Sequence, residues 1–175
     1  MKNLVLVGFM GSGKTSAGKL VARQLGMEFL DTDALIEQRL GRTIAQIFET
    51  DGEPFFRDRE RDIVRELAAR DGLVIATGGG IVLNPDNVRD FSRTGIVICC
   101  WIEPRIAFER TRHTKHRPLL ESDSDRQTCI ETLLRQREPL YRAIPLQLDT
   151  SNLTIEKQAD ALVRIYQDQS ARARL

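Results

Sequence analysis

The sequence predicts a single α/β domain, a three-layer sandwich in which a five-stranded parallel sheet is flanked by helices. The first observation is that short apolar runs alternate with helical patterns, an order that favours right-handed crossovers between parallel strands. The second is that three of these runs are almost entirely Val, Ile, Leu and Cys, as in strands buried on both faces. The third is a glycine-rich segment between the first strand and the first helix, where open α/β sheets bind ligands.

The predicted elements follow one another without repeats or linkers, so we expect one domain. Strands are expected at residues 4–7, 28–30, 73–76, 96–101 and 146–148. Helical patterns cover residues 16–25, a segment that starts near Glu53, residues 105–112 after Pro104, and the amphipathic stretches 126–138 and 154–168. Asn84 followed by Pro85 indicates a helix cap and a first helical position. The polar tail from Ser170 is expected to fray.

The composition excludes several classes of function. The net charge of +1 means that no sequence-wide basic field marks a nucleic-acid binder. No apolar run approaches the roughly 20 residues of a membrane helix, and residues 1–3 lead into a strand without a signal-peptide pattern. Cys99, Cys100 and Cys129 lack zinc-ligand spacing and are interpreted as small buried residues in a reducing compartment. We expect a cytoplasmic protein without nucleic-acid or membrane partners, and a monomer.

Residues 8–15, Gly-Phe-Met-Gly-Ser-Gly-Lys-Thr, fit the phosphate-loop pattern G-x-x-x-x-G-K-[ST]. The glycines let successive backbone N–H groups turn inward around phosphate oxygens, and the following helix points its positive end at the same anion. Lys14 is expected to reach the β- and γ-phosphates, and Thr15 to bind magnesium. A chance glycine turn is the alternative, which the flanking strand and helix disfavour. The loop therefore predicts ATP and Mg²⁺ as ligands, with ATP bound by Gly11, Ser12, Gly13, Lys14, Thr15 and Ser16.

Two carboxylates close the second predicted strand, in the segment Asp31-Thr32-Asp33. Because the carboxyl ends of parallel strands face the ligand crevice, both are expected beside the phosphates. One can serve the magnesium shell, while the other can orient or deprotonate an attacking hydroxyl. The alternative is that one of them merely caps the next helix.

Two arginines fall on apolar helix faces. Arg57 flanks a stripe that includes Glu60, and Arg137 lies within the stripe of a later helix. Buried charge is costly unless it is paired. Glu60 could satisfy one arginine, which leaves positive charge for an anionic ligand, and a planar guanidinium suits a carboxylate or a phosphate. The alternative is a purely structural ion-pair cluster.

Two further segments indicate contact with a ligand. Gly78, Gly79 and Gly80 follow the third strand, and three consecutive glycines favour close backbone approach over a loose turn. Basic side chains crowd residues 110–120, among them Arg110 and Arg117. Most charge runs are solvated loops. Beside a phosphate loop, this one predicts a mobile lid at about residues 110–122 that closes over ATP and excludes water.

Taken together and in order, these motifs resemble those of the shikimate kinase family. They span most of the chain: the phosphate loop, Asp31-Thr32-Asp33, Gly52-Glu53-x-x-Phe56-Arg57-x-x-Glu60, Gly78-Gly79-Gly80, Arg117-Pro118-Leu119-Leu120 and Arg137-x-Pro139-Leu140-Tyr141. The resemblance implies a P-loop fold of the nucleoside-monophosphate-kinase type with strand order 2-3-1-4-5. It also implies transfer of the γ-phosphoryl group of ATP to the 3-hydroxyl of shikimate, giving shikimate 3-phosphate and ADP.

The resemblance also implies roles for individual residues. It assigns shikimate binding to Asp33, Arg57, Gly79, Gly80 and Arg137, to which we add the neighbouring Gly78. It places Arg117 in the lid against the ATP phosphates and Arg110 against the adenine, although no motif marks an adenine loop near residues 149–153. In the expected in-line transfer, Asp33 orients the hydroxyl and accepts its proton. The charge that develops is neutralised by Lys14, Arg117 and a magnesium ion on Thr15, with Asp31 bound to that ion directly or through water.

Other functions fit part of this pattern. Another small-molecule kinase, such as a gluconate kinase or a nucleoside monophosphate kinase, would use the same phosphate loop. A nucleotide-binding module without an acceptor belongs to a different class. The N/T-K-x-D guanine motif of a GTPase is absent from the sequence, as is the strand-end Asp-Glu pair of a mechanical ATPase. ADP release that depends on an added small acid distinguishes the kinase from the binding module.

Overall fold

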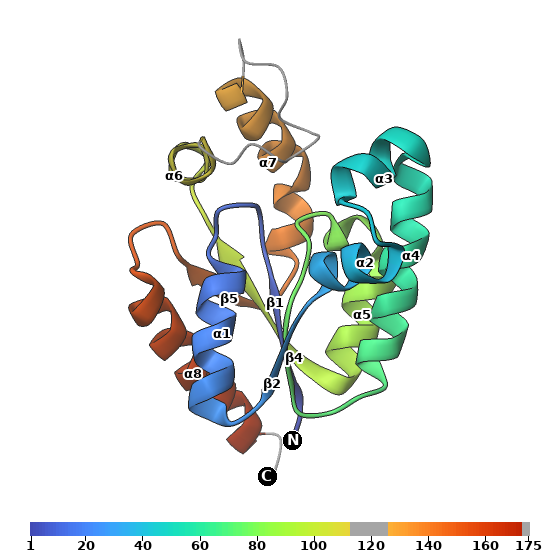
Figure 1. Cartoon of the computed structure of the whole chain (residues 1–175). Helices are drawn as coiled ribbons and strands as arrows, with labels where there is room; N and C mark the ends of the chain where they lie inside the picture. Colours follow the sequence, from blue (N-terminus) through green and yellow to red (C-terminus); the bar gives the residue numbers. More distant parts are fainter. Residues whose placement is uncertain (113–125, 173–175) are drawn as a thin grey trace.

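A computed structural model describes residues 1–112 and 126–172, and Figure 1 shows how the elements are arranged. The strands are β1 (Asn3–Val7), β2 (Glu28–Asp31), β3 (Leu73–Ala76), β4 (Gly95–Trp101) and β5 (Leu146–Asp149). They form one parallel sheet in the order β2-β3-β1-β4-β5. The predicted sheet and strand order are confirmed, and each predicted run lies within an observed strand.

Helices cover both faces of the sheet. α1 (Lys14–Leu25) and α8 (Ile155–Arg172) pack on one face with Leu4 and Leu6 of β1. Val5 and Val7 point into a second core built with the remaining helices. These are α2 (Thr32–Leu40), α3 (Ile44–Thr50), α4 (Gly52–Ala68), α5 (Pro85–Thr94), α6 (Pro104–Thr111) and α7 (Arg126–Arg142). Side chains that alternate along β1 thus fill two cores, which explains why its sequence is apolar throughout.

Two short helices were not among the predicted helical patterns, although a cap at residues 31–33 was considered for the first of them. α2 begins after Asp31, whose side chain accepts hydrogen bonds from the backbone N–H groups of Asp33 and Ala34. α3 begins with a capping box, in which Thr43 and Gln46 each bond the other's backbone. The Thr-x-x-Gln spacing is readable in the sequence and could have located α3. The predicted cap at Asn84 is confirmed, since its side chain accepts from the Asp86 N–H.

Three expectations need correction. α8 continues to Arg172, so the chain does not fray from Ser170. That end of the helix is held because Tyr166 donates a 2.7 Å hydrogen bond to the carbonyl of Lys2. α7 runs past residue 138 to Arg142 with Pro139 inside it, because the buried side chain of Tyr141 packs into the core beyond the proline. Cys99 and Cys100 are buried, as expected, whereas Cys129 is only half-buried.

Part of the chain lies outside this description. Residues 113–125, which contain most of the predicted lid and Arg117, are outside the described residues. Within the described part, no helix combines the length and the apolar character that crossing a bilayer demands.

Candidate active site

A pocket of about 520 Å³ opens at the carboxyl ends of the strands, between the β1–α1 loop, the start of α2 and the loop after β3. Its lining includes the predicted site residues Gly11, Gly13, Lys14, Thr15, Ser16, Asp31, Asp33, Gly78, Gly79 and Arg110. Ser12, Arg57, Gly80 and Arg137 do not line it. The structure therefore brings together segments that are far apart in the sequence, as expected at the edge of an open parallel sheet.

The phosphate loop is closed by its own polar side chains. Ser12 Oγ and Lys14 Nζ both donate to the carbonyl of Phe9, at 2.8 and 2.9 Å, and Lys14 Nζ also lies 3.2 Å from Ser12 Oγ. Gly13, the N-cap of α1, has a φ of +80°, a left-handed conformation that favours glycine. The loop thus leads directly into the N-terminus of α1, a suitable place for an anion.

A buried glutamine of α8 is hydrogen-bonded to the phosphate loop. Gln158 of α8 is fully buried, and its Nε2 donates a 2.9 Å hydrogen bond to the carbonyl of Ser12. Because the C=O and N–H of one trans peptide point in opposite directions, this bond turns the Gly13 N–H away from α8. Gln158 was not among the predicted site residues. The signal that found Glu60, a polar residue on an apolar helix stripe, was present here too, with Ala159 and Leu162 beside it.

The hydroxyl of Thr15 and the carboxylate of Asp31 lie side by side. Thr15 Oγ1 donates to Asp31 Oδ2 at 2.8 Å, while Asp31 Oδ1 caps α2. The capping role that the sequence left as an alternative is therefore confirmed for Asp31, whose other carboxylate oxygen faces the phosphate loop. Both groups are hard oxygen donors, the type that Mg²⁺ prefers, so these residues fit that ion.

Two charged side chains lie in the space that a larger side chain at Gly78 or Gly80 would need. A Cβ on Gly78 would lie 2.4 Å from Asp33 Oδ1, and a Cβ on Gly80 would lie 2.4 Å from both terminal nitrogens of Arg57. Any larger residue would displace these groups. The glycine run thus lets Asp33 and Arg57 approach the backbone of the loop after β3.

Glu60 is the most buried acid next to the site, with 1% of its side chain exposed. Its Oε2 accepts a 2.9 Å bond from Arg57, which also binds Glu53 at 2.8 Å. Burial raises the pKa of Glu60 to about 7, although the nearby Arg57 opposes the shift. The ion-pair cluster considered as an alternative is therefore present around Arg57.

Arg137 reaches the same region from α7. It is 7% exposed, which confirms that it points inward. One turn further along, Tyr141 donates a 2.6 Å hydrogen bond to the carbonyl of Gly79, and burial raises the pKa of its hydroxyl. α7 thus reaches the loop at residues 78–80 through Tyr141, next to the place where Asp33 lies over Gly78. The contact of Tyr141 with Gly79 was not predicted.

Arg110 joins three segments at the other end of the pocket. Its guanidinium donates to the carbonyls of Thr150 and Ser151, both at 3.1 Å, and to the carbonyl of Gly11 at 3.3 Å. It therefore ties α6 to the phosphate loop and to the β5–α8 loop, the segment in which the adenine contacts were expected.

A family model described as shikimate kinase matches residues 10–167. The chain belongs to the shikimate kinase family. A shikimate kinase from Thermodesulfovibrio yellowstonii is 41% identical over 167 residues, which cover 95% of this chain and 96% of that protein. The structure of the shikimate kinase from Acinetobacter baumannii in complex with shikimate has a TM-score of 0.91 at 36% identity, covering 97% of this chain and 94% of that one.

The family assignment agrees with the strand order and with the order of the motifs along the chain. A gluconokinase from Sinorhizobium meliloti is also similar in structure, with a TM-score of 0.58 at 17% identity, covering 98% of this chain and 97% of that one. That likeness shows a common fold alone. It gives no support for gluconate as the acceptor of this chain.

Proposed function

We propose that this chain transfers the γ-phosphoryl group of ATP to the 3-hydroxyl of shikimate, giving shikimate 3-phosphate and ADP. The observation that carries the proposal is the placement of Asp33 over Gly78, both of which line the phosphate pocket, and of Arg57 over Gly80, two residues further along the same loop. This arrangement puts a proton acceptor and an anion-binding group within one acceptor site. Shikimate has both matching features, hydroxyl groups and a carboxylate.

On the donor side, the phosphates of ATP bind the backbone N–H groups of the phosphate loop and the N-terminus of α1. Lys14, which lies at the loop, neutralises charge on the β- and γ-phosphates. Thr15 and Asp31 would hold Mg²⁺, which supplies charge neutralisation on the transferring phosphoryl group when it is bound. The guanidinium of Arg110, held at its edges by carbonyls of the β5–α8 loop, leaves a flat face for the adenine ring.

On the acceptor side, Asp33 accepts the hydroxyl hydrogen, orients the oxygen for in-line attack and takes its proton. Arg57 and Arg137 bind the shikimate carboxylate, a group that a planar guanidinium can bind through two hydrogen bonds. The backbone of Gly78, Gly79 and Gly80 completes this side. Arg117, which lies outside the described residues, is proposed to reach the transferring phosphoryl from the lid.

The test is ADP release from ATP and Mg²⁺ with shikimate, gluconate, AMP or no acceptor. We expect release that depends on shikimate. Release with gluconate or AMP instead would overturn the proposed acceptor. ATP binding without release in the presence of any acceptor would favour a nucleotide-binding module over an enzyme.

Replacing Gln158 by leucine is expected to raise the KM for ATP about fivefold, the effect of losing one buried hydrogen bond. The change leaves the Ser12 carbonyl without its donor from α8 and frees the Gly13 peptide to rotate. Steady-state kinetics with each substrate varied in turn measures the effect. Gln24→Leu is the control, because the exposed bond from Gln24 to Asp160 joins α1 to α8 away from the phosphate loop. A parallel rise in the KM for shikimate would contradict a role confined to the phosphate loop.

The stability of the chain should depend on pH through Glu60. Its pKa is higher in the folded chain, about 7, than its ordinary value of 4.5. Its contribution to the free energy of unfolding is therefore complete below about pH 4.5 and is lost as the pH rises through about 7. The Tm of Glu60→Gln, whose side chain stays neutral, is expected to rise relative to wild type between about pH 5 and about pH 8.

Glu66→Gln provides the matched control for this measurement. Glu66 is on the same helix, but its bond to Arg39 lowers its pKa, so its contribution to stability is lost only as the pH falls. Thermal melts across the pH range compare the two variants. A Tm difference for Glu60→Gln that stays constant over this range would show that Glu60 is ionised throughout.

A further inference from the structure

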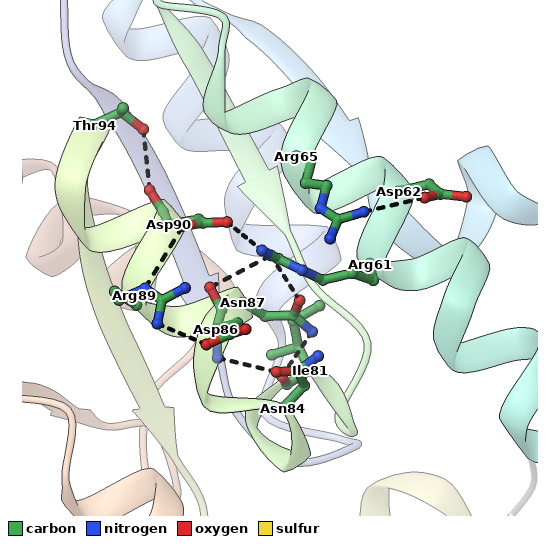
Figure 2. Close-up of polar contacts among 10 residues, drawn as sticks. All are labelled: Arg61, Asp62, Arg65, Ile81, Asn84, Asp86, Asn87, Arg89, Asp90 and Thr94. Atoms are coloured by element: carbon green, nitrogen blue, oxygen red, sulfur yellow. Dashed lines mark hydrogen bonds and ion pairs between the residues drawn. The ribbon is translucent and has the colours of Figure 1, made fainter.

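A polar network behind the glycine loop takes no part in the proposed chemistry (Figure 2). Asn87 of α5 donates from Nδ2 to the carbonyl of Ile81 at 3.2 Å. Its Oδ1 accepts from one terminal nitrogen of Arg61 on α4 at 3.3 Å. The other terminal nitrogen of Arg61 binds the carboxylate of Asp90. Asn87 is 1% exposed, so its amide has been withdrawn from water for these contacts.

Ile81 directly follows the run of three glycines. Its N–H donates to the carbonyl of Gly78 at 3.2 Å, and the N–H of Leu83 donates to the carbonyl of Gly80 at 3.0 Å. Residues 78–83 therefore form two successive hydrogen-bonded turns that include the 3-10 helix η1 (Ile81–Leu83), and the contact at Ile81 anchors this segment to α5. Glycine has more backbone freedom than any other residue, so a run of three needs such an anchor to keep one conformation.

α4, the helix that carries Arg61, also contacts the loop directly. Arg57, one turn before Arg61 on α4, lies over Gly80. α4 thus contacts the loop directly through Arg57 at Gly80, and it is linked to Ile81 indirectly, because Arg61 binds Asn87 of α5. The side chains of Arg61 and Asp90 are each 14% exposed, so their ion pair is partly shielded from solvent. A shift of Ile81 away from α5 would therefore move Gly80 relative to the Arg57 guanidinium.

We propose that Arg61 and Asn87 are positioning residues of the acceptor site, which hold the glycine loop at a fixed distance from Arg57. They touch neither nucleotide nor acceptor and act only through the backbone of residues 78–83. The inference rests on the proposed function for its link to the acceptor. The restraint on the loop itself is independent of which acceptor binds.

The variant Asn87→Asp separates positioning from packing. It keeps an oxygen to accept from Arg61 and adds charge opposite that guanidinium, so the α4–α5 connection is retained. It removes the only hydrogens that Asn87 can donate to the carbonyl of Ile81. We expect a Tm close to that of wild type, together with faster amide hydrogen exchange in residues 78–83 by about fivefold, the effect of one lost hydrogen bond. The KM for shikimate should rise by a similar factor of about five, with kcat and the KM for ATP within about twofold.

Two further variants complete the test. Arg61→Lys keeps a cation opposite Asp90 but cannot span both Asp90 and Asn87, so it should speed exchange in the same segment. Arg89→Ala is the matched control, because Arg89 binds Asp86 and Asp90 at the exposed edge of the same network. It should leave exchange in residues 78–83 and the KM for shikimate unchanged.

The inference would be overturned if Asn87→Asp changed neither amide hydrogen exchange in residues 78–83 nor the KM for shikimate. A uniform rise in exchange across all segments, with a matching fall in Tm, would overturn it as well, because that result describes a purely structural contact. Faster exchange confined to residues 78–83 would support the restraint even if shikimate were not the acceptor. Absence of shikimate-dependent ADP release in wild type would count against the proposed function instead.

Discussion

Replacing Asp33 by asparagine is expected to lower kcat by about 10²- to 10⁴-fold, the contribution of a positioned general base. Asparagine has nearly the shape of aspartate and fits in the same space over Gly78. It cannot take the hydroxyl proton, and its amide can donate where the reaction needs an acceptor. The KM for ATP should stay close to wild type, because the phosphate loop and the N-cap at Asp31 are unchanged. Steady-state kinetics and calorimetric binding of ATP measure the two effects separately.

Asp62→Asn is the control for this substitution, since Asp62 lies on the exposed face of α4. It should leave both kinetic constants unchanged. A kcat of Asp33→Asn within a few-fold of wild type would remove the proposed role of this carboxylate. The acceptor hydroxyl would then lose its proton without help from Asp33.

Arg137→Ala is expected to raise the KM for shikimate by about 10- to 100-fold, the effect of losing a buried, charge-assisted hydrogen bond. The KM for ATP should change far less, because Arg137 is close enough to Glu60 to influence its charge and does not line the phosphate pocket. Arg137→Lys should also bind shikimate poorly, since an ammonium group cannot make the paired contact of a guanidinium with a carboxylate. Kinetics with each substrate varied in turn provides the measurement.

Arg135, an exposed arginine on the same helix, supplies the matched control through Arg135→Ala and Arg135→Lys. Both are expected to behave as wild type. Equal rises in the two KM values for the Arg137 variants would indicate a general disturbance of α7. In that case the proposed carboxylate clamp would be wrong.

Local signals in the sequence determined most of the framework. Val, Ile, Leu and Cys runs located the strands, since a strand covered on both faces has apolar side chains on both. Asn84 before Pro85 located the start of α5, and the Thr-x-x-Gln spacing at Thr43 carried an equally clear signal for α3 that was missed. The phosphate loop was found because only a particular glycine spacing lets the backbone surround a phosphate. The strand order came from the family resemblance, because equally apolar parallel strands carry no mark of which neighbours they pair with.

Tertiary structure decided how the charged and polar groups meet. The sequence placed Arg57 and Arg137 on inward helix faces, and the fold then put Arg57 over Gly80. Three contacts were not predictable from spacing: Gln158 with Ser12, Arg110 with the β5–α8 loop, and Arg61 with Asn87. Periodicity shows which face of a helix is buried, and it does so from a few neighbouring residues. The partner of a buried side chain lies up to 164 positions away along the chain, as Lys2 does from Tyr166, and is set by how whole helices pack on the sheet.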